Sequence, residues 1–252
     1  MVHVLEQIAR DHVAPLAKVY GLARRGRSFY LTNDRDDAVA LHLRGNRLLH
    51  IGEGTATFRI AGSITNPEFD RLSYMGPAAY ARGAAMSPTP PPKAFGFVEM
   101  SALVPPLEFS HVKVYYDRFL QDAMHPLEPT RPYPRPDEAA VRMQPDWCYD
   151  PDVHDIDEFG RMVVRALQKQ NYLNTLITLL DREVLLGELR LPHRDSILQR
   201  TGWMAFIVGA QELDPDSFTE LLKTREDMNP ELRARFAALN LQWRSDVVEG
   251  ER

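Results

Sequence analysis

The sequence predicts an α+β protein: an N-terminal helix plus an antiparallel β-meander, packed against a C-terminal all-helical half. In the N-terminal half, short runs of alternating apolar and polar residues are joined by short turns, which is typical of an antiparallel sheet. Beyond a proline-rich stretch at residues 125–136, apolar residues recur at helical spacing instead. The chain of 252 residues is 44% hydrophobic and 26% charged, which suffices for a buried core.

A helix is expected at the start of the chain. Its apolar residues recur at helical spacing: Leu5, Ile8, Val13, Leu16 and Val19. Pro15 should kink this helix or mark a break in it, because proline lacks the backbone N–H that a helix interior uses. Gly21 should end the helix, and Lys18 in the last turn suits the negative end of the helix dipole.

Strands are expected next. The segment 27–33 is rich in aromatic and β-branched residues, and residues 39–44 alternate between apolar and polar side chains. A tight turn at Gly45-Asn46 should lead into a strand over 47–53, and residues 55–65 should form another. Two later segments, 93–100 and 109–116, are further strand candidates. The residues predicted to face the core are Val39, Leu41, Leu43, Phe58 and Ile60.

The proline-rich stretch at 125–136 is expected to join two halves, 1–128 and 129–252, that pack as one unit. In the second half Asp155 should cap a helix, with Glu158 three residues later. A strongly apolar helix over 172–189 should be central, so that Leu180→Asp would unfold the chain. Three further helices are expected over 195–212, with Asp195 as its cap, over 214–224, and from Asn229 onwards.

Several classes of protein are excluded by composition. A single cysteine, Cys148, cannot form an intramolecular disulfide, and its neighbours Trp147 and Tyr149 indicate a buried thiol. The net charge of −5 provides no global attraction for nucleic acid. The N-terminal residues lack the pattern of a signal peptide, and no window has the apolar length of a membrane span. We therefore expect a soluble cytoplasmic protein that binds neither nucleic acid nor membrane.

Basic residues gather around the first expected strand: Lys18, Arg24, Arg25, Arg27 and Arg35, with Tyr20 and Tyr30 nearby. Guanidinium groups beside aromatic rings suit the recognition of phosphate or carboxylate groups. The alternative is a solvated hairpin whose charges keep an edge strand soluble. The candidate residues for binding an anion or a partner are Arg24, Arg25, Arg27, Tyr30 and His42.

The densest acidic segment is 146–158, where five aspartates and a glutamate surround His154. Such oxygens could hold a divalent cation, but they serve equally as turn and cap residues before a helix. We predict no tightly bound metal. Among the histidines, His42, His50 and His111 fall on strand candidates without a local metal-binding motif. No phosphate-binding loop, dinucleotide fingerprint or nucleophile elbow occurs, and no cofactor is expected.

The segments RRGRSFYL, TATFRIAGSI and DWCYDP, following a first helix that ends at Gly21, are similar to a bacterial family catalogued as domain of unknown function 4304. The resemblance covers most of residues 1–190. It implies a helix, aromatic strands and a tryptophan ahead of helical residues. It implies no activity, and no catalytic residue is carried over from it.

Two functions are consistent with these patterns. The first is a non-catalytic protein-binding factor of the accessory, adaptor or immunity type. Its charge is polarised, with an excess of basic residues over 1–50 and of acidic residues over 145–195, and such polarity steers partners. The second is an enzyme or small-ligand-binding protein with an anion-recognising pocket at the junction of sheet and helices. Its residues would come from the binding candidates above together with Asp150 and His154. A deep pocket where arginines and histidines converge favours the second function, and a flat charged face favours the first.

Overall fold

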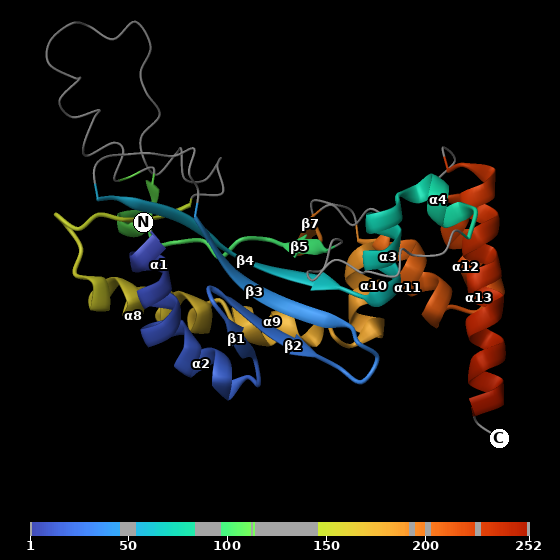
Figure 1. Cartoon of the computed structure of the whole chain (residues 1–252), viewed down its shortest axis with the longest axis horizontal. Coiled ribbons are helices and arrows are strands. Elements are labelled where there is room, and N and C mark those ends of the chain that lie inside the picture. Colours follow the sequence, from blue (N-terminus) through green and yellow to red (C-terminus); the bar gives the residue numbers. More distant parts are fainter. Residues whose placement is uncertain are drawn as a thin grey trace, which may run out of the picture. The chain divides into compact units, whose positions relative to one another are not determined.

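The computed structural model describes residues 2–45, 54–83, 97–111, 113, 146–191, 195–199, 203–224 and 228–250 (Figure 1). Its helices are α1 (Val2–Gln7), the π-helix η1 (Ile8–Val13), α2 (Ala14–Val19), α3 (Pro67–Met75), α4 (Pro77–Ala81), the 3₁₀ turn η2 (Leu107–Phe109), α8 (Ile156–Lys169), α9 (Tyr172–Thr178), α10 (Arg182–Arg190), α11 (Met204–Glu212), α12 (Pro215–Lys223) and α13 (Pro230–Gly250). Its strands are β1 (Ala23–Arg25), β2 (Ser28–Thr32), β3 (Ala38–Gly45), β4 (Ala56–Thr65), β5 (Val98–Met100), β6 (Trp147–Tyr149) and β7 (Leu198–Gln199).

An antiparallel sheet and a set of helices make up the fold, as the α+β prediction requires. Within the described residues seven strands form one sheet in the order β1-β2-β3-β4-β5-β7, and β6 pairs with the beginning of β4. The five core positions predicted from alternation, on β3 and β4, are each at most 2% exposed. The five predicted positions are therefore buried, although Ala40, Thr57 and Ala61, which point to the opposite face, are buried as well.

The N-terminal helix is not uniform. Leu5, Ile8 and Val13 are fully buried, but Val19 is 81% exposed. The π-helix η1 precedes α2, and Pro15 lies in the first turn of α2. The Ala14 N–H still reaches back to the Ala9 carbonyl of the π-helix, whereas Pro15, the next residue, has no N–H to donate. The break predicted at Pro15 thus takes the form of a change in helix type just before it.

The chain divides into two compact units, each built from three segments that are far apart in the sequence. The first unit comprises Met1–Leu31, Ala40–Gly62 and Ser101–Leu176. The second comprises Thr32–Val39, Ser63–Met100 and Ile177–Arg252. The predicted joint between halves, at residues 128 and 129, lies outside the described residues.

An aromatic cluster forms the core of the first unit. Phe58 of β4 packs against Trp147 of β6 and Phe159 of α8, with ring centroids 6.4 and 5.9 Å away. Helix α8 begins at the predicted cap, where Asp155 accepts hydrogen bonds from two backbone N–H groups. Tyr172 donates from its hydroxyl to the Ser101 carbonyl at 2.6 Å. Sheet, helix and loop are thereby joined inside this unit.

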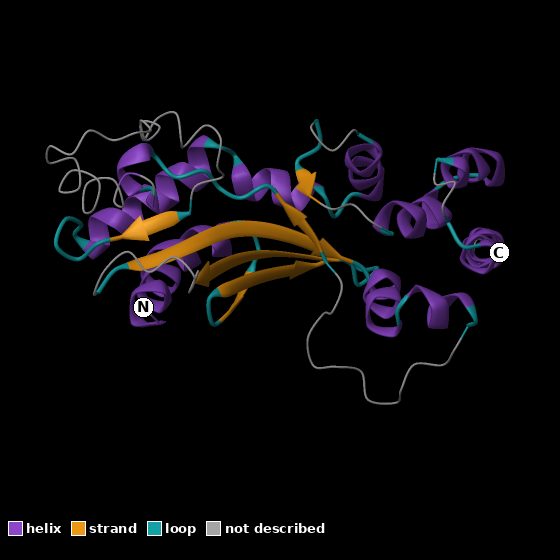
Figure 2. Ribbon diagram, turned by 90° about the horizontal axis from the view of Figure 1, so that it is seen from above, coloured by secondary structure: helices purple, strands orange, loops and turns teal. Residues whose placement is uncertain are grey.

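Helix α11 is the central element of the second unit, which consists mainly of helices (Figure 2). All residues from Met204 to Ala210 are buried, and α11 contacts α10, α12, α13 and α3. The last helix, α13, also packs along α4, where the rings of Tyr80 and Phe236 lie 5.9 Å apart. The C-terminal helices therefore contact helices that precede them by more than a hundred positions.

The prediction of a single helix over residues 172–189 is wrong. The structure has two helices, α9 and α10, separated at Leu179–Asp181, and Asp181 caps α10 by accepting from two backbone N–H groups. Leu180 is only half-buried and Val184 is 42% exposed, so this segment is not the central helix. The apolar residues of this segment favour one continuous helix. The side chain of Asp181 instead accepts hydrogen bonds from the N–H groups of Glu183 and Val184, and a new helix starts there.

Two other predicted elements need correction. The helix expected from Asp195 begins only at Met204, and Leu198–Gln199 form the short strand β7 instead. The strand expected over 109–116 is wrong in its described part: Phe109 ends a 3₁₀ turn, Ser110 forms a single bridge with Trp147, and His111 and Lys113 are helical. The predicted strand over 47–53 and the proline tract at 125–136 lie outside the described residues.

Candidate functional site

The hairpin of β1 and β2 carries most of the candidate binding residues. Gly26, with a positive φ of 60°, occupies its two-residue turn together with Arg27. Arg25 pairs with Ser28, and Ala23 pairs with Tyr30. Directly opposed residues of an antiparallel pair point to the same face, so Arg25 and Tyr30 share one face of the hairpin.

His42 of β3 lies on the same face. Its Nδ1 is 2.9 Å from the hydroxyl of Ser28, and its ring meets the ring of Tyr30 edge-on at 5.8 Å. Arg44, two residues along β3, points the same way because side chains alternate along a strand. We name this surface, made of Arg25, Ser28, Tyr30, His42 and Arg44, the basic face.

Burial, together with the charge of Arg44, lowers the pKa of His42 to about 4. His42 is therefore neutral at pH 7, and one of its ring nitrogens can accept a hydrogen bond. A base with so low a pKa is poorly matched to proton abstraction near neutral pH. The Ser28–His42 pair is consequently a polar contact that orients two groups and is a poor nucleophile–base pair.

Two of the predicted site residues stand apart from the basic face. Arg24 pairs with Phe29, which is fully buried, so its side chain lies on the opposite face. There it donates to the Gly26 carbonyl at 2.8 Å and forms an ion pair with Glu6 of α1. Arg27 is half-buried at the turn, and its carbonyl accepts from the Leu43 N–H. Arg24 thus holds the hairpin against the helix, and Arg27 marks the hairpin tip.

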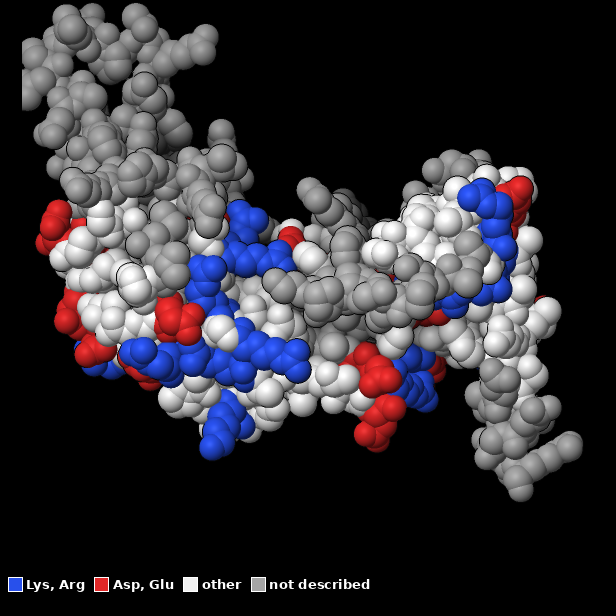
Figure 3. Space-filling view, in the orientation of Figure 1, with Lys and Arg blue, Asp and Glu red and all other residues white. Residues whose placement is uncertain are grey.

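Positive charge is concentrated over these strands. Figure 3 shows Lys and Arg side chains gathered across the region where Figure 1 draws α2 and β1–β3. No aspartate or glutamate occurs in β1, β2 or β3. The Arg35 of the predicted basic cluster belongs instead to the second unit, where it pairs with Glu212.

The acidic segment 146–158 is engaged in structural contacts. Asp146 is 2% exposed and pairs with Arg59 at 2.9 Å. Asp155 caps α8, and Asp157 lies 3.1 Å from Nε2 of His12. Asp150 accepts from the Asp152 N–H in the turn before α8. Among the residues with a described placement, no group of three His, Cys, Asp or Glu side chains is arranged around a metal position. The absence of a tightly bound metal stays a prediction.

Asp150 and His154 lie beside the aromatic core of the first unit. The ring of His154 stacks on Phe109 at 5.1 Å and meets Phe159 at 5.5 Å. Its Nδ1 accepts from the Asp150 N–H at 3.1 Å. Burial lowers the pKa of His154, against the opposing influence of Asp150 and Glu158. Neither Asp150 nor His154 makes a described contact with the basic face.

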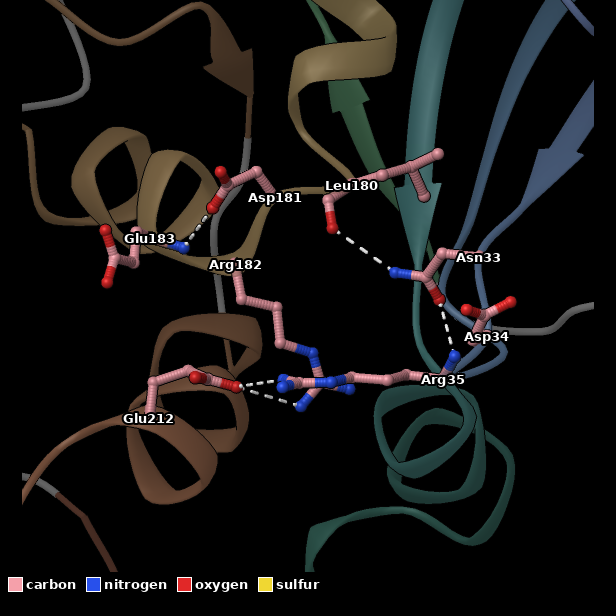
Figure 4. Close-up of a pocket in the computed structure, with 8 residues that line it drawn as sticks. All are labelled: Asn33, Asp34, Arg35, Leu180, Asp181, Arg182, Glu183 and Glu212. Atoms are coloured by element: carbon pink, nitrogen blue, oxygen red, sulfur yellow. Dashed lines mark hydrogen bonds and ion pairs between the residues drawn. The ribbon is translucent and has the colours of Figure 1, made fainter.

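A cavity of about 460 Å³ lies in the second unit. It is lined by Asn33, Asp34, Arg35, Leu180, Asp181, Arg182, Glu183 and Glu212 (Figure 4). Four carboxylates and two guanidinium groups give this lining a formal charge of −2. An anion would therefore meet a net repulsive lining. None of the predicted anion-binding residues takes part in it.

Three residues that line the cavity, Arg35, Arg182 and Glu212, belong to an ion network. Arg182 forms a bidentate pair with Asp37 at 2.7 and 2.9 Å, and both side chains are largely buried. Glu212 accepts from Arg182 at 3.2 Å and from Arg35 at 2.8 Å (Figure 4). Burial opposes the charge of Arg182, but Asp37 and Glu212 outweigh it and raise the pKa of Arg182. The network joins the loop before β3 to helices α10 and α11.

Sequence reasoning missed this network. Asn33 organises the loop by accepting from the N–H groups of Arg35 and Asp37, at 2.9 and 3.0 Å. That pattern is recognisable in the sequence as an Asn-led polar turn. The pairing of Asp37 with Arg182 cannot be recognised in the sequence, because 145 positions separate the two residues.

No protein-family model, curated protein or solved structure matches this chain. The resemblance to the family of unknown function stays a prediction. Within the described part of the chain, every helix is too short or too polar to cross a membrane.

Proposed function

We propose that this chain is a non-catalytic binding protein of the accessory, adaptor or immunity type, which recognises an acidic protein partner through the basic face. The observation that carries the proposal is the shared orientation of Arg25, Ser28, Tyr30 and His42. Arginine supplies a planar fork of donors that matches a carboxylate, and Tyr30 adds a neutral hydroxyl donor. Cytoplasmic location and bacterial origin belong to the same proposal.

The charge on these strands supports an anionic partner. Arg25 is exposed, and no described hydrogen bond or ion pair engages its side chain. By contrast, Arg24 on the opposite face is engaged by Glu6. An exposed arginine on a strand surface that lacks carboxylates retains its donors for a partner, and it steers an oppositely charged surface toward itself.

Two observations favour a binding surface over an enzyme. The low pKa of His42 makes the Ser28–His42 pair a weak base and nucleophile at neutral pH. The cavity described in the second unit is lined by an excess of carboxylates and includes no residue of the basic face. A protein partner needs no deep pocket, because arginine and tyrosine frequently anchor interfaces from a surface.

The proposal is tested with a fluorescently labelled peptide of alternating Glu and Asp, titrated with the full chain at low and moderate salt. A charge-assisted hydrogen bond contributes about 1.5–3 kcal/mol. Arg25→Gln should therefore weaken peptide binding by at least roughly tenfold, and added salt should weaken it further. Tyr30→Phe should have a smaller effect, because it removes one neutral donor and keeps the ring.

The matched control is Arg161→Gln, which removes an exposed arginine from α8. Equal loss of affinity in Arg25→Gln and Arg161→Gln would refute the basic face as the binding site. A single-stranded oligonucleotide of equal charge serves as a competitor. Tighter binding of the oligonucleotide than of the peptide would contradict an acidic protein as the partner.

A further inference from the structure

Strand β6 has an unusual pair of contacts at its two ends. The backbone N–H of Asp146, just before the strand, donates to Nδ1 of His111 at 2.9 Å. The backbone N–H of Asp150, just after it, donates to Nδ1 of His154 at 3.1 Å. A backbone amide nitrogen can only donate, so both ring nitrogens must be unprotonated acceptors. Both histidines are therefore neutral while these two bonds exist.

The residues between these ends are buried. Trp147 and Cys148 are fully buried, and Trp147 donates from Nε1 to the Leu103 carbonyl at 3.1 Å. The strand pairs with β4 over three residues and with Ser110 through one bridge. A strand of three residues has few ladder hydrogen bonds, so its end contacts are a large share of what holds it.

Two charged groups and one main-chain group face His154. The carboxylate of Asp150 lies in the turn before it, that of Glu158 lies on α8, and the ring makes a hydrogen bond with the main chain of Glu108. The three aromatic rings around it, from Phe109, Tyr149 and Phe159, carry no charge at neutral pH. Burial outweighs the nearby carboxylates, so the neutral ring is favoured in the folded protein.

His111 is also buried, at 9% exposure. The charged residues beside it are Asp146, which pairs with Arg59 of β4, and Lys113 two positions along the chain. Its own backbone N–H donates to the Asp146 carbonyl at 2.9 Å. His111 and Asp146 thus exchange two hydrogen bonds, one of which requires an unprotonated ring.

We propose that His111 and His154 form a clasp that holds the two ends of β6, and that protonation of His154 opens its end of this clasp. Protonation turns Nδ1 of His154 from an acceptor into a donor that points at the Asp150 N–H, which is itself a donor. That backbone N–H then loses its partner, and an unsatisfied buried polar group is costly. At the other end, Nδ1 of His111 also lies 3.4 Å from the Asp146 carbonyl. The end of the strand beside Asp150 therefore separates from β4 as the pH falls.

The direction of the pH effect follows from the lowered pKa of His154. The ring of the released strand takes up a proton near pH 6.5, while the ring in the closed clasp resists it. The closed state is therefore fully favoured above about pH 6.5 and loses stability as the pH falls toward the lowered pKa. Within that window, His154 raises the population of the open state by up to about tenfold for each pH unit.

Hydrogen exchange of the full chain, followed by mass spectrometry from pH 7.5 to pH 5, tests the clasp. Exchange rates are corrected for the intrinsic pH dependence of amide exchange and expressed relative to β2. We expect the peptide containing 147–150 to lose protection between pH 6.5 and pH 5, by up to about tenfold for each pH unit, while β2 keeps its protection. Equal loss of protection in both peptides would overturn the proposal.

The double variant His111→Asn/His154→Asn keeps an acceptor near each Nδ1 position but cannot be protonated. It should remove the selective loss of protection at β6, and a retained loss would refute the clasp. If the variant is unfolded, nitrogen chemical shifts of the histidine rings in the wild-type chain decide the question. An Nδ1 that is protonated at pH 7.5 in either ring would contradict the proposal.

Discussion

At the scale of single residues, one glycine sets how closely two helices approach. Gly160 of α8 lies against His12 of η1, and a Cβ built at Gly160 would be 2.2 Å from Cδ2 of that ring. Gly187 of α10 has no atom within 4 Å of the corresponding position. The two glycines therefore have opposite roles, although both lie in helices and cost helix stability relative to alanine.

Gly160→Ala should lower the free energy of unfolding by about 1–3 kcal/mol, because the added methyl group forces His12 and the two helices apart. Gly187→Ala is the matched control and should raise stability by about 0.5–1 kcal/mol, because alanine favours the helix and meets no neighbour. Urea denaturation of the two variants measures both effects. A Gly160→Ala variant as stable as the wild type would show that the helices approach less closely than described.

At the scale of elements, capping residues decide where the helices begin. Asp155, Asp181 and Asp214 each accept hydrogen bonds from two backbone N–H groups at the start of a helix. The cap at Asp181 splits the apolar segment 172–189 into α9 and α10. Apolar periodicity alone did not reveal this boundary, because both sides of it are rich in leucine.

Asp181→Ala should destabilise the chain by about 0.5–2 kcal/mol, since two N–H groups of α10 lose their acceptor. Asp181→Asn keeps an acceptor oxygen and should cost much less. Thermal unfolding followed by circular dichroism compares the two variants. If the alanine and asparagine variants unfold at the same temperature, the cap is not what stabilises this helix start.

At the scale of the whole molecule, residues distant in sequence assemble each unit. The second unit brings the loop at 33–37 to helices α10 and α11 through the pairs of Arg182 with Asp37 and Glu212. Its centre is α11, whose apolar residues are buried on every side. Helices that are apolar all round are usually central, and in this protein that helix is α11 and not the segment 172–189.

Val208→Asp should abolish the cooperative unfolding transition of the second unit, because Val208 is fully buried in α11 and a charge there would be unpaired. Val184→Asp is the matched control and should fold normally, since Val184 is 42% exposed on α10. Near-ultraviolet circular dichroism and urea denaturation distinguish the two results. A fully folded Val208→Asp variant would contradict the central position of α11.

Some features were predictable because they depend on neighbours along the chain. Alternation placed Val39, Leu41 and Leu43 on the buried face, and the aspartate before α8 identified a helix start. The basic composition of β1 was visible too, although its three residues gave no strand pattern. Local hydrogen bonds and side-chain periodicity have a range of only a few residues, and the sequence displays them directly.

The sequence by itself determined the fold class, the buried apolar positions of β3 and β4 and the residue types of the basic cluster. Only the tertiary structure decided that Arg25 and His42 share a face while Arg24 turns away to Glu6. It also decided that Arg182 meets Asp37, and that His111 and His154 hold the two ends of β6. The physical reason is that strand register and long-range ion pairs depend on how the whole chain packs, and one sequence carries no direct record of those distances.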